Sequence, residues 1–407
     1  MSKIMKGALG LFLFLIPVSV FSQTDTWAQR DSIKGPPKSA CVAFTAYTSG
    51  FVGGGFDLFE YKRSFYRYDP AVDDWDQLSS LGDTTGSGLE RSSAVAFSIN
   101  NMGYVGLGQG LNPFFDDFWQ YDPATDSWTQ VADFGGTART MAVGFAIDTA
   151  GYVGTGADAN GFKNDFWRYS PATNTWYPIA AFPGSPRRLA VGIAVGNVGY
   201  VGTGDDGTFK KDFWKYTPTT NNWSPIADFG GTARYGATGF SRYPSLFVGT
   251  GYDNTLNYKN DLWEFNFWSG TWISRASFPS TPRSNAIGFT IGQSGFIGGG
   301  FDGDPKDDFY EYFIPLSTNF NEPGTTEFTL FPNPANQQVE IKTTSEFEIQ
   351  QVSIYNVQGK RVISMAVSAN HQSSVVIPVY TFETGMYICE VTDKNGMVYC
   401  QKFDVAR

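Results

Sequence analysis

The sequence predicts an all-β protein: a six-bladed β-propeller with four strands per blade, whose N-terminal strand closes the last blade, followed by a small C-terminal β-sandwich. Three observations predict it. One unit recurs six times, each copy carries four strand-like segments, and a tryptophan missing from the sixth copy stands alone before the first. A four-stranded sheet cannot cover both of its own faces, so such repeats stack and close into a ring.

The clearest marker of the repeat is an aromatic residue followed by Val or Ile, glycine, any residue and a second glycine. Its copies are spaced 53, 48, 48, 47 and 49 residues apart. They begin at Phe51, Tyr104, Tyr152, Tyr200, Phe247 and Phe296. Each is a short apolar run beside turn residues, which is typical of a buried strand.

Three further units accompany this marker. The second is aspartate followed by Phe or Leu, an aromatic residue, any residue and another aromatic residue, as in "NDFWRY" from Asn164. The third is a tryptophan after a turn, such as Trp176. The fourth is a small apolar run, such as "AVGF" from Ala142. No helical period of 3.6 occurs within the repeats, so each copy is expected to form four short strands.

The closure of the ring is predicted from the missing tryptophan. The sixth copy ends at Tyr312 without one, whereas Trp27 precedes the first copy. Eleven positions lead from Trp27 to Lys38, the same spacing that leads from tryptophan to arginine in later copies. The segment around Trp27 is therefore predicted to pair with Phe309–Phe313 as the outer strand of blade six.

With these units, residues 24 to 315 resemble a kelch-type, galactose-oxidase-like six-bladed propeller. The glycine doublet of that family is kept at Gly54-Gly55 and Gly299-Gly300. Its first glycine is replaced in the other four copies, by Leu107, Thr155, Thr203 and Thr250. The resemblance implies the architecture and argues against close kinship with a characterised kelch protein.

The N-terminus has the pattern of a secretory signal peptide over residues 1–22: Lys3 and Lys6, an apolar run from Ala8 to Ile16, and small residues before Ser22. The propeller is expected over 23–315, a linker over 316–327 and the sandwich over 328–407. Loss of the signal peptide would move the formal charge from −10 to −12. We therefore expect an exported monomer with no transmembrane segment and no nucleic-acid partner.

The last 80 residues alternate apolar and polar side chains, as in Val352-Ser353-Ile354-Tyr355, between turn signals. They resemble the type A sorting domain of the type IX (Por) secretion system, through "LFPNPA" from Leu330, "IYNVQGK" from Ile354, "GMY" from Gly385 and "KFDV" from Lys402. The resemblance implies export by the type IX machinery to the outer-membrane surface of a Gram-negative bacterium, or secretion, with the tail removed or used as an anchor.

Two of the three cysteines lie on either side of one turn signal. Cys389 and Cys400 flank the segment Asp393 to Gly396, and they face each other if Thr392 pairs with Met397. A cross-strand disulfide is one interpretation. Two free thiols are the other.

The chemistry available to the propeller is limited, because the only histidine is His371 in the tail. Copper galactose oxidase activity and His-dependent nucleophilic catalysis are therefore not expected, and no catalytic residue, resident metal or cofactor is predicted. The acidic loop "DGDPKDD" from Asp302 has oxygen ligands for Ca²⁺. Ordinary Asx turns account for the same aspartates.

A cation opens the inner strand of every copy, followed in two copies by Arg188 or Tyr235, which break the symmetry. The cations are Lys38, Arg91, Arg139, Arg187, Arg234 and Arg283. One hypothesis is a collar around a channel mouth that binds a carboxylated or sulfated ligand. The alternative is that each cation pairs with the aspartate before the third strand and holds its blade together.

The sequence thus favours a secreted or surface-displayed binding protein whose propeller presents loops to a glycan or protein ligand. The alternative is a sugar-acting enzyme, such as a sialic-acid mutarotase-like kelch epimerase, with arginines on the carboxylate and an acid for proton transfer.

Overall fold

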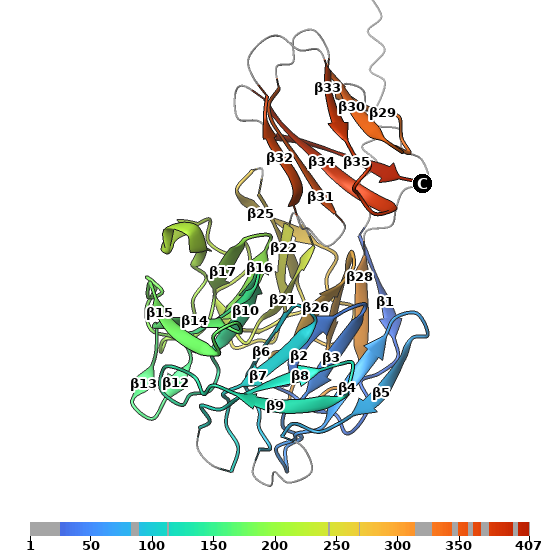
Figure 1. Ribbon diagram of the computed structural model, residues 1–407. Helices are drawn as coiled ribbons and strands as arrows, with labels where there is room; N and C mark the ends of the chain where they lie inside the picture. The colour runs from blue at the N-terminus through green and yellow to red at the C-terminus, as the bar shows by residue number, and fades with distance from the viewer. Residues whose placement is uncertain are drawn as a thin grey trace, which may run out of the picture.

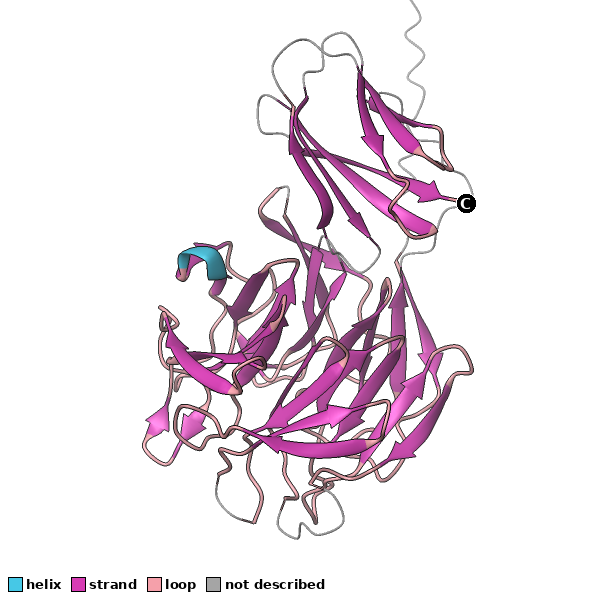
Figure 2. Ribbon diagram, viewed as in Figure 1, coloured by secondary structure: helices cyan, strands magenta, loops and turns pink. Residues whose placement is uncertain are grey.

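The computed structural model describes residues 25–82, 89–111, 114–242, 245–267, 269–313, 328–343, 349–356, 361–367, 374–393 and 398–406. The predicted signal peptide, the predicted linker and His371 lie outside these residues. The described part is built almost wholly of antiparallel strands, with one turn of 3-10 helix at Pro218–Thr220 (Figure 2). Within it, no helix is long and apolar enough to cross a membrane.

Six four-stranded sheets surround a common axis (Figure 1). The first three are β2 (Val42–Ala46), β3 (Ser49–Gly53), β4 (Phe65–Asp69) and β5 (Asp74–Leu78); β6 (Val95–Ile99), β7 (Met102–Gly106), β8 (Phe118–Asp122) and β9 (Ser127–Val131); and β10 (Val143–Ile147), β11 (Ala150–Gly154), β14 (Phe166–Ser170) and β15 (Thr175–Ile179).

The other three are β16 (Val191–Val195), β17 (Val198–Gly202), β18 (Phe213–Thr217) and β19 (Asn222–Ile226); β21 (Thr238–Arg242), β22 (Ser245–Gly249), β24 (Leu262–Asn266) and β25 (Thr271–Arg275); and β26 (Ile287–Ile291), β27 (Ser294–Gly298), β28 (Phe309–Phe313) and β1 (Thr26–Arg30). Short pairs at one end are β12 (Ala157–Asp158) with β13 (Gly161–Phe162), and β20 (Arg234–Tyr235) with β23 (Tyr252–Asp253). We number the six sheets as blades one to six.

The predicted closure by the N-terminal strand is confirmed. Strand β1 pairs antiparallel with β28, and Trp27 lies opposite Tyr312; the two strands run side by side in Figure 1. The Trp27 indole donates a hydrogen bond to the Ala276 carbonyl at 2.9 Å, in the preceding blade. Trp176 makes the equivalent bond to the Ala132 carbonyl at 3.1 Å. Trp27 therefore fills the position that the sixth copy leaves empty.

A ring of backbone hydrogen bonds joins all six blades at one end of the axis. It runs through one residue per blade, located just before each inner strand, and each has a left-handed φ between 52° and 61°. Each N–H donates to the carbonyl of the preceding member at 2.8–3.2 Å, and Ala40 closes the circle onto Asn285. The members of this backbone ring are Ala40, Ser93, Met141, Leu189, Gly236 and Asn285.

The blades interlock through a phenylalanine and a glycine. A Cβ added at Gly103 would lie 2.3 Å from the Phe44 ring, and one at Gly199 would lie 2.4 Å from the Phe145 ring, so only glycine fits. Blade five is different because Leu246 occupies the glycine position. The facing residue in blade four is correspondingly smaller, Ile193, and the two belong to one buried cluster.

This size exchange predicts strong coupling between Ile193 and Leu246. Ile193→Phe alone should cost about 1–3 kcal/mol of unfolding free energy, because the ring overpacks against leucine. Leu246→Gly alone leaves a cavity, but Ile193→Phe added to it should restore stability by filling that space. Urea unfolding of the four proteins measures the coupling, and purely additive effects would refute the proposed interlock.

The C-terminal part is a two-sheet sandwich. One sheet is β29 (Phe328–Phe331), β30 (Gln338–Thr343) and β33 (Ser374–Pro378); the other is β32 (Arg361–Ala366), β31 (Ile349–Asn356), β34 (Gly385–Asp393) and β35 (Val398–Val405). Both sheets contribute to a single buried cluster that includes Ile341, Val352 and Phe403.

The register expected around the two C-terminal cysteines is wrong by one residue. Thr392 lies opposite Val398, not Met397. Cys389 therefore pairs with Gln401, and Cys400 pairs with Glu390. The facing arrangement on which the disulfide prediction depended is therefore not present in this register.

Candidate functional site at the channel mouth

The five arginines considered for a collar are buried within their own blades. They are 0–1% exposed, and each binds both carboxylate oxygens of one aspartate. The pairs are Arg91–Asp117, Arg139–Asp165, Arg187–Asp212, Arg234–Asp261 and Arg283–Asp308. The guanidinium groups cannot reach a ligand, so the collar hypothesis is wrong for these residues and the alternative of a blade-stabilising pair describes them.

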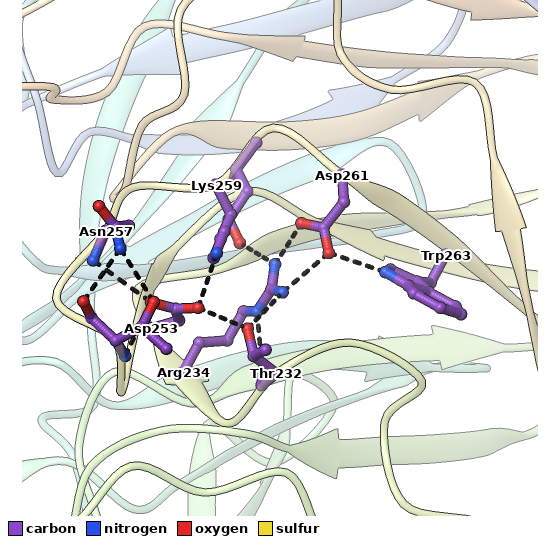
Figure 3. A network of polar contacts seen from close by, with 9 residues as sticks. Thr232, Arg234, Asp253, Asn257, Lys259, Asp261 and Trp263 are labelled. Atoms are coloured by element: carbon purple, nitrogen blue, oxygen red, sulfur yellow. Dashed lines mark hydrogen bonds and ion pairs between the residues drawn. The ribbon is translucent and has the colours of Figure 1, made fainter.

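Figure 3 shows this arrangement in blade five. Arg234 donates to the two Asp261 oxygens at 2.5 and 2.8 Å and to the Thr250 carbonyl at 2.7 Å. The Trp263 indole N–H donates a further hydrogen bond to the Asp261 carboxylate at 2.8 Å. The guanidinium carbon lies 4.9 Å from the centre of the Phe229 ring. Arg234 also donates to the carbonyl and the hydroxyl of Thr232, so all of its donors are used inside the blade. Because all five arginines are buried on an aspartate, none of them can hold the carboxylate of a substrate of the sugar-acting enzyme.

Lys38 is buried as well, but it lacks the aspartate. Ser64 stands at the equivalent position of blade one. The Lys38 ammonium is buried without a hydrogen-bond partner among the described residues and lies 4.5 Å from the centre of the Tyr66 ring. Burial lowers the pKa of Lys38. At 2% exposure Lys38 does not form part of a collar either.

The acidic loops fold as Asx turns held by lysines. In the loop considered for Ca²⁺, the Asp302 carboxylate accepts the Asp304 N–H at 3.3 Å and pairs with Lys306 at 2.9 Å. Asp253 pairs with Lys259 at 2.8 Å and accepts the Thr232 hydroxyl at 2.8 Å (Figure 3). Among the described residues, no three His, Cys, Asp or Glu side chains are grouped as metal ligands.

Asp158 is expected to make the folding stability of the propeller depend on pH in the acid range. Burial of its carboxyl raises the pKa, but hydrogen bonds from Lys163 and Thr137 outweigh burial and bring the pKa down to about 2 from 3.8. The carboxylate thus stabilises the fold fully above pH 3.8, and this contribution is lost as the pH falls toward 2. Asp158→Asn should therefore lower the thermal midpoint at pH 6, with a difference that shrinks toward pH 2. A constant difference from pH 6 to pH 2 would contradict it.

Arg188 and Tyr235, the residues that break the repeat symmetry, lie beside the backbone ring. Serine or threonine occupies the same position in the other four blades, as at Thr140. Arg188 has a side chain 39% exposed, donates to Asp205 at 3.1 Å, and lies 5.1 Å from the centre of the Phe162 ring. Strand bridges join these positions directly to the loops that follow each glycine pair.

Half-buried rings continue from this pair across blades four, five and six. The centroids of successive rings lie 4.9, 5.6, 5.0 and 6.2 Å apart. We call this set the aromatic arc: Phe209, Tyr235, Tyr252, Tyr258 and Phe301. Burial and the neighbouring Tyr252 raise the pKa of both Tyr235 and Tyr258, so their hydroxyls remain protonated donors at neutral pH.

The channel itself is narrow. A space of about 200 Å³ follows the axis and is lined by residues of the inner strands with small side chains or none, including Ala142, Ala190 and Gly192. Cys41 stands where later copies have alanine, and burial raises the pKa of its thiol to about 11. The side chains that line the channel are mostly small, and the larger ones that distinguish one blade from another lie at its mouth.

Sequence reasoning found Arg188 and Tyr235 but missed the rest of the arc. Phe209 and Tyr258 lie in loops and Tyr252 lies in the short strand β23, and these segments differ from copy to copy. A signal was available, because aromatic residues stand just before the loop lysines Lys210 and Lys259. This signal can be interpreted only in the folded propeller, where the circle of blades brings the loops of neighbouring blades side by side.

Comparison with known proteins agrees with the fold. Residues 329–405 match the secretion system C-terminal sorting domain, and residues 103–135 match the Kelch motif. No curated protein matches the chain. A solved structure described as that of YjhT is similar with a TM-score of 0.58 and 17% identity, covering 68% of this chain and 95% of its own. At this identity the similarity concerns the fold alone.

The six interlocked blades, the matched repeat and the matched tail support one conclusion. The chain is a kelch-type β-propeller followed by a type IX sorting domain, and it is accordingly a secreted or cell-surface protein.

Proposed function

We propose that this protein is an exported binding protein that takes a glycan or protein ligand at the channel mouth, on the aromatic arc and the Arg188–Asp205 pair. The observation that carries the proposal is asymmetry. In five blades the arginine before the inner strand pairs with an aspartate of the same blade. Arg188 and Tyr235, in contrast, place large polar side chains at positions that are otherwise Ser or Thr. Departures from repeat symmetry that are not needed for packing favour a binding role.

The composition of the arc supports the proposal. Half-buried tyrosines present a rigid apolar body and a hydroxyl, and few rotatable bonds must be fixed on binding. The arc stands on loops anchored at both ends by strand bridges, as between Tyr235 and Tyr252. A pre-ordered surface of this kind loses little conformational entropy when a ligand binds.

Arrays that carry both glycans and surface proteins test the proposal. The exported chain should bind a limited set of spots, and an Arg188→Ala/Tyr235→Ala variant should lose at least about tenfold in affinity for them. Tyr177→Ala is the matched control, because Tyr177 is 42% exposed on an outer strand away from the mouth. No binding by the wild-type chain, or unchanged binding by the double variant, would refute the mouth as the site.

We further propose that residues 1–22 direct the first export step and that the tail directs passage across the outer membrane of a Gram-negative cell. The match at residues 329–405 supports the second part. Deletion of residues 328–407 should leave the propeller in the periplasm, measured by fractionation and surface labelling with the intact chain as control. Surface display of the truncated chain would contradict the assignment.

A further inference from the structure

We infer that the ligand of the channel mouth is a neutral oligosaccharide, a chain of pyranose units that lies along the aromatic arc with its hydroxyls on the Arg188–Asp205 pair. The inference rests on the proposed function. It differs from the anionic ligand that the collar hypothesis implied, and it follows from how charge is distributed around the mouth.

The cations at the mouth are matched by carboxylates. Arg188 binds Asp205 at 3.1 Å, and lysines in the neighbouring loops each bind an aspartate at 2.8–2.9 Å. These lysine pairs are Lys163–Asp158, Lys210–Asp206, Lys259–Asp253 and Lys306–Asp302. Asp304 adds an exposed carboxylate, and the chain as a whole carries a formal charge of −10. An anionic ligand would therefore meet no net attraction.

The polar groups of the pair suit hydroxyls. The Arg188 side chain is 39% exposed and uses Nε and one terminal nitrogen on Asp205, so the other terminal nitrogen is not needed for this pair. Asp205 also accepts the Gly207 N–H at 2.9 Å, which fixes its carboxylate. Because Asp205 is 7% exposed and both of its oxygens already accept hydrogen bonds, the Arg188 guanidinium is the group available to a ligand. Its charge is already paired, and such a donor suits the oxygen of a sugar hydroxyl.

The arc suits the apolar faces of the same ligand. Its half-buried rings continue over three blades with neighbouring centroids 4.9–6.2 Å apart, which makes an extended aromatic row. A pyranose carries C–H groups on its ring faces and hydroxyls at its edge, so it matches a phenol that is apolar with a polar tip. A chain of sugars, more than a single one, covers such a surface.

Titration calorimetry on the intact exported chain tests the inference. The probes are cellohexaose, mannohexaose and xylohexaose as neutral ligands, and oligogalacturonate and a heparin hexasaccharide as anionic ones. We expect a neutral hexasaccharide to bind at least about tenfold more tightly than either anion. Its affinity should change less than about twofold between 50 and 500 mM NaCl, because no net charge is neutralised.

Variants assign the binding to the arc. Tyr252→Ala should weaken it about tenfold, Tyr252→Phe should retain most of it, and Tyr177→Ala should leave it unchanged. Tighter, salt-sensitive binding of an anion, or no binding of any neutral hexasaccharide, would overturn the inference. If array proteins bind through Arg188 and Tyr235 while no neutral glycan does, the proposed binding function stands and only this ligand class fails.

Discussion

Replacing Asp261 with alanine should lower the free energy of unfolding by about 3–5 kcal/mol. The change leaves the guanidinium of Arg234, which is 0% exposed, buried without a counter-charge. Arg234 donates to both Asp261 oxygens, and the Trp263 indole also loses its acceptor. Urea unfolding followed by tryptophan fluorescence measures the difference.

The same substitution at Asp228 is the control. Asp228 pairs with Lys211 at 3.6 Å, and both side chains are more than half exposed, so Asp228→Ala should change stability by no more than about 0.5 kcal/mol. A loss below about 1 kcal/mol for Asp261→Ala would show that the arginine finds other partners when its aspartate is removed, and that the pair adds little to the blade.

Trp27→Ala should have the second large effect, about 3 kcal/mol, because it weakens the strand that closes the ring. The indole contacts the rings of Phe278 and Tyr312 at centroid distances of 5.4 and 5.1 Å and donates to the Ala276 carbonyl. Truncation removes this apolar contact and leaves the carbonyl without its donor. Thermal unfolding monitored by circular dichroism measures the change.

Gln29→Ala on the same strand controls for the strand itself. Gln29 is exposed, and its backbone pairing with Tyr310 does not depend on the side chain. The unfolding free energies of Trp27→Ala and Gln29→Ala should therefore differ by most of the loss expected for Trp27→Ala. Equal and small effects would show that backbone pairing alone holds β1 in place.

The fold was predictable because each strand of a blade has its own local sequence pattern, and that pattern recurs in successive blades. The glycine-rich strand marks the position of Phe51 and its five counterparts, and the displaced Trp27 predicts the closure that the register of β1 confirms. Ile193 and Leu246 can each be seen in the sequence as departures from the repeat. That they compensate each other cannot be predicted from it, because only the stacked sheets show that these residues, 53 positions apart in the chain, face each other.

The site was predictable only in part. An arginine that recurs in every later blade has the same pattern whether its side chain points to a ligand or to a buried aspartate, and the geometry decides for the aspartate. Arg188 and Tyr235 were found because they depart from the repeat. The arc was missed because Tyr258 and Phe301 meet only across a blade boundary, at 6.2 Å. The cysteine register failed for a simpler reason, since the loop length was judged from a turn motif alone.

The backbone ring has a consequence for how this propeller can change. Its six bonds join main-chain N–H and carbonyl groups only, so the circle they define keeps its diameter whatever side chains flank it. Substitution at the flanking positions, now Ser39, Ser92, Thr140, Arg188, Tyr235 and Ser284, can therefore alter selectivity without altering the scaffold. One circular frame can in this way serve many different recognition surfaces.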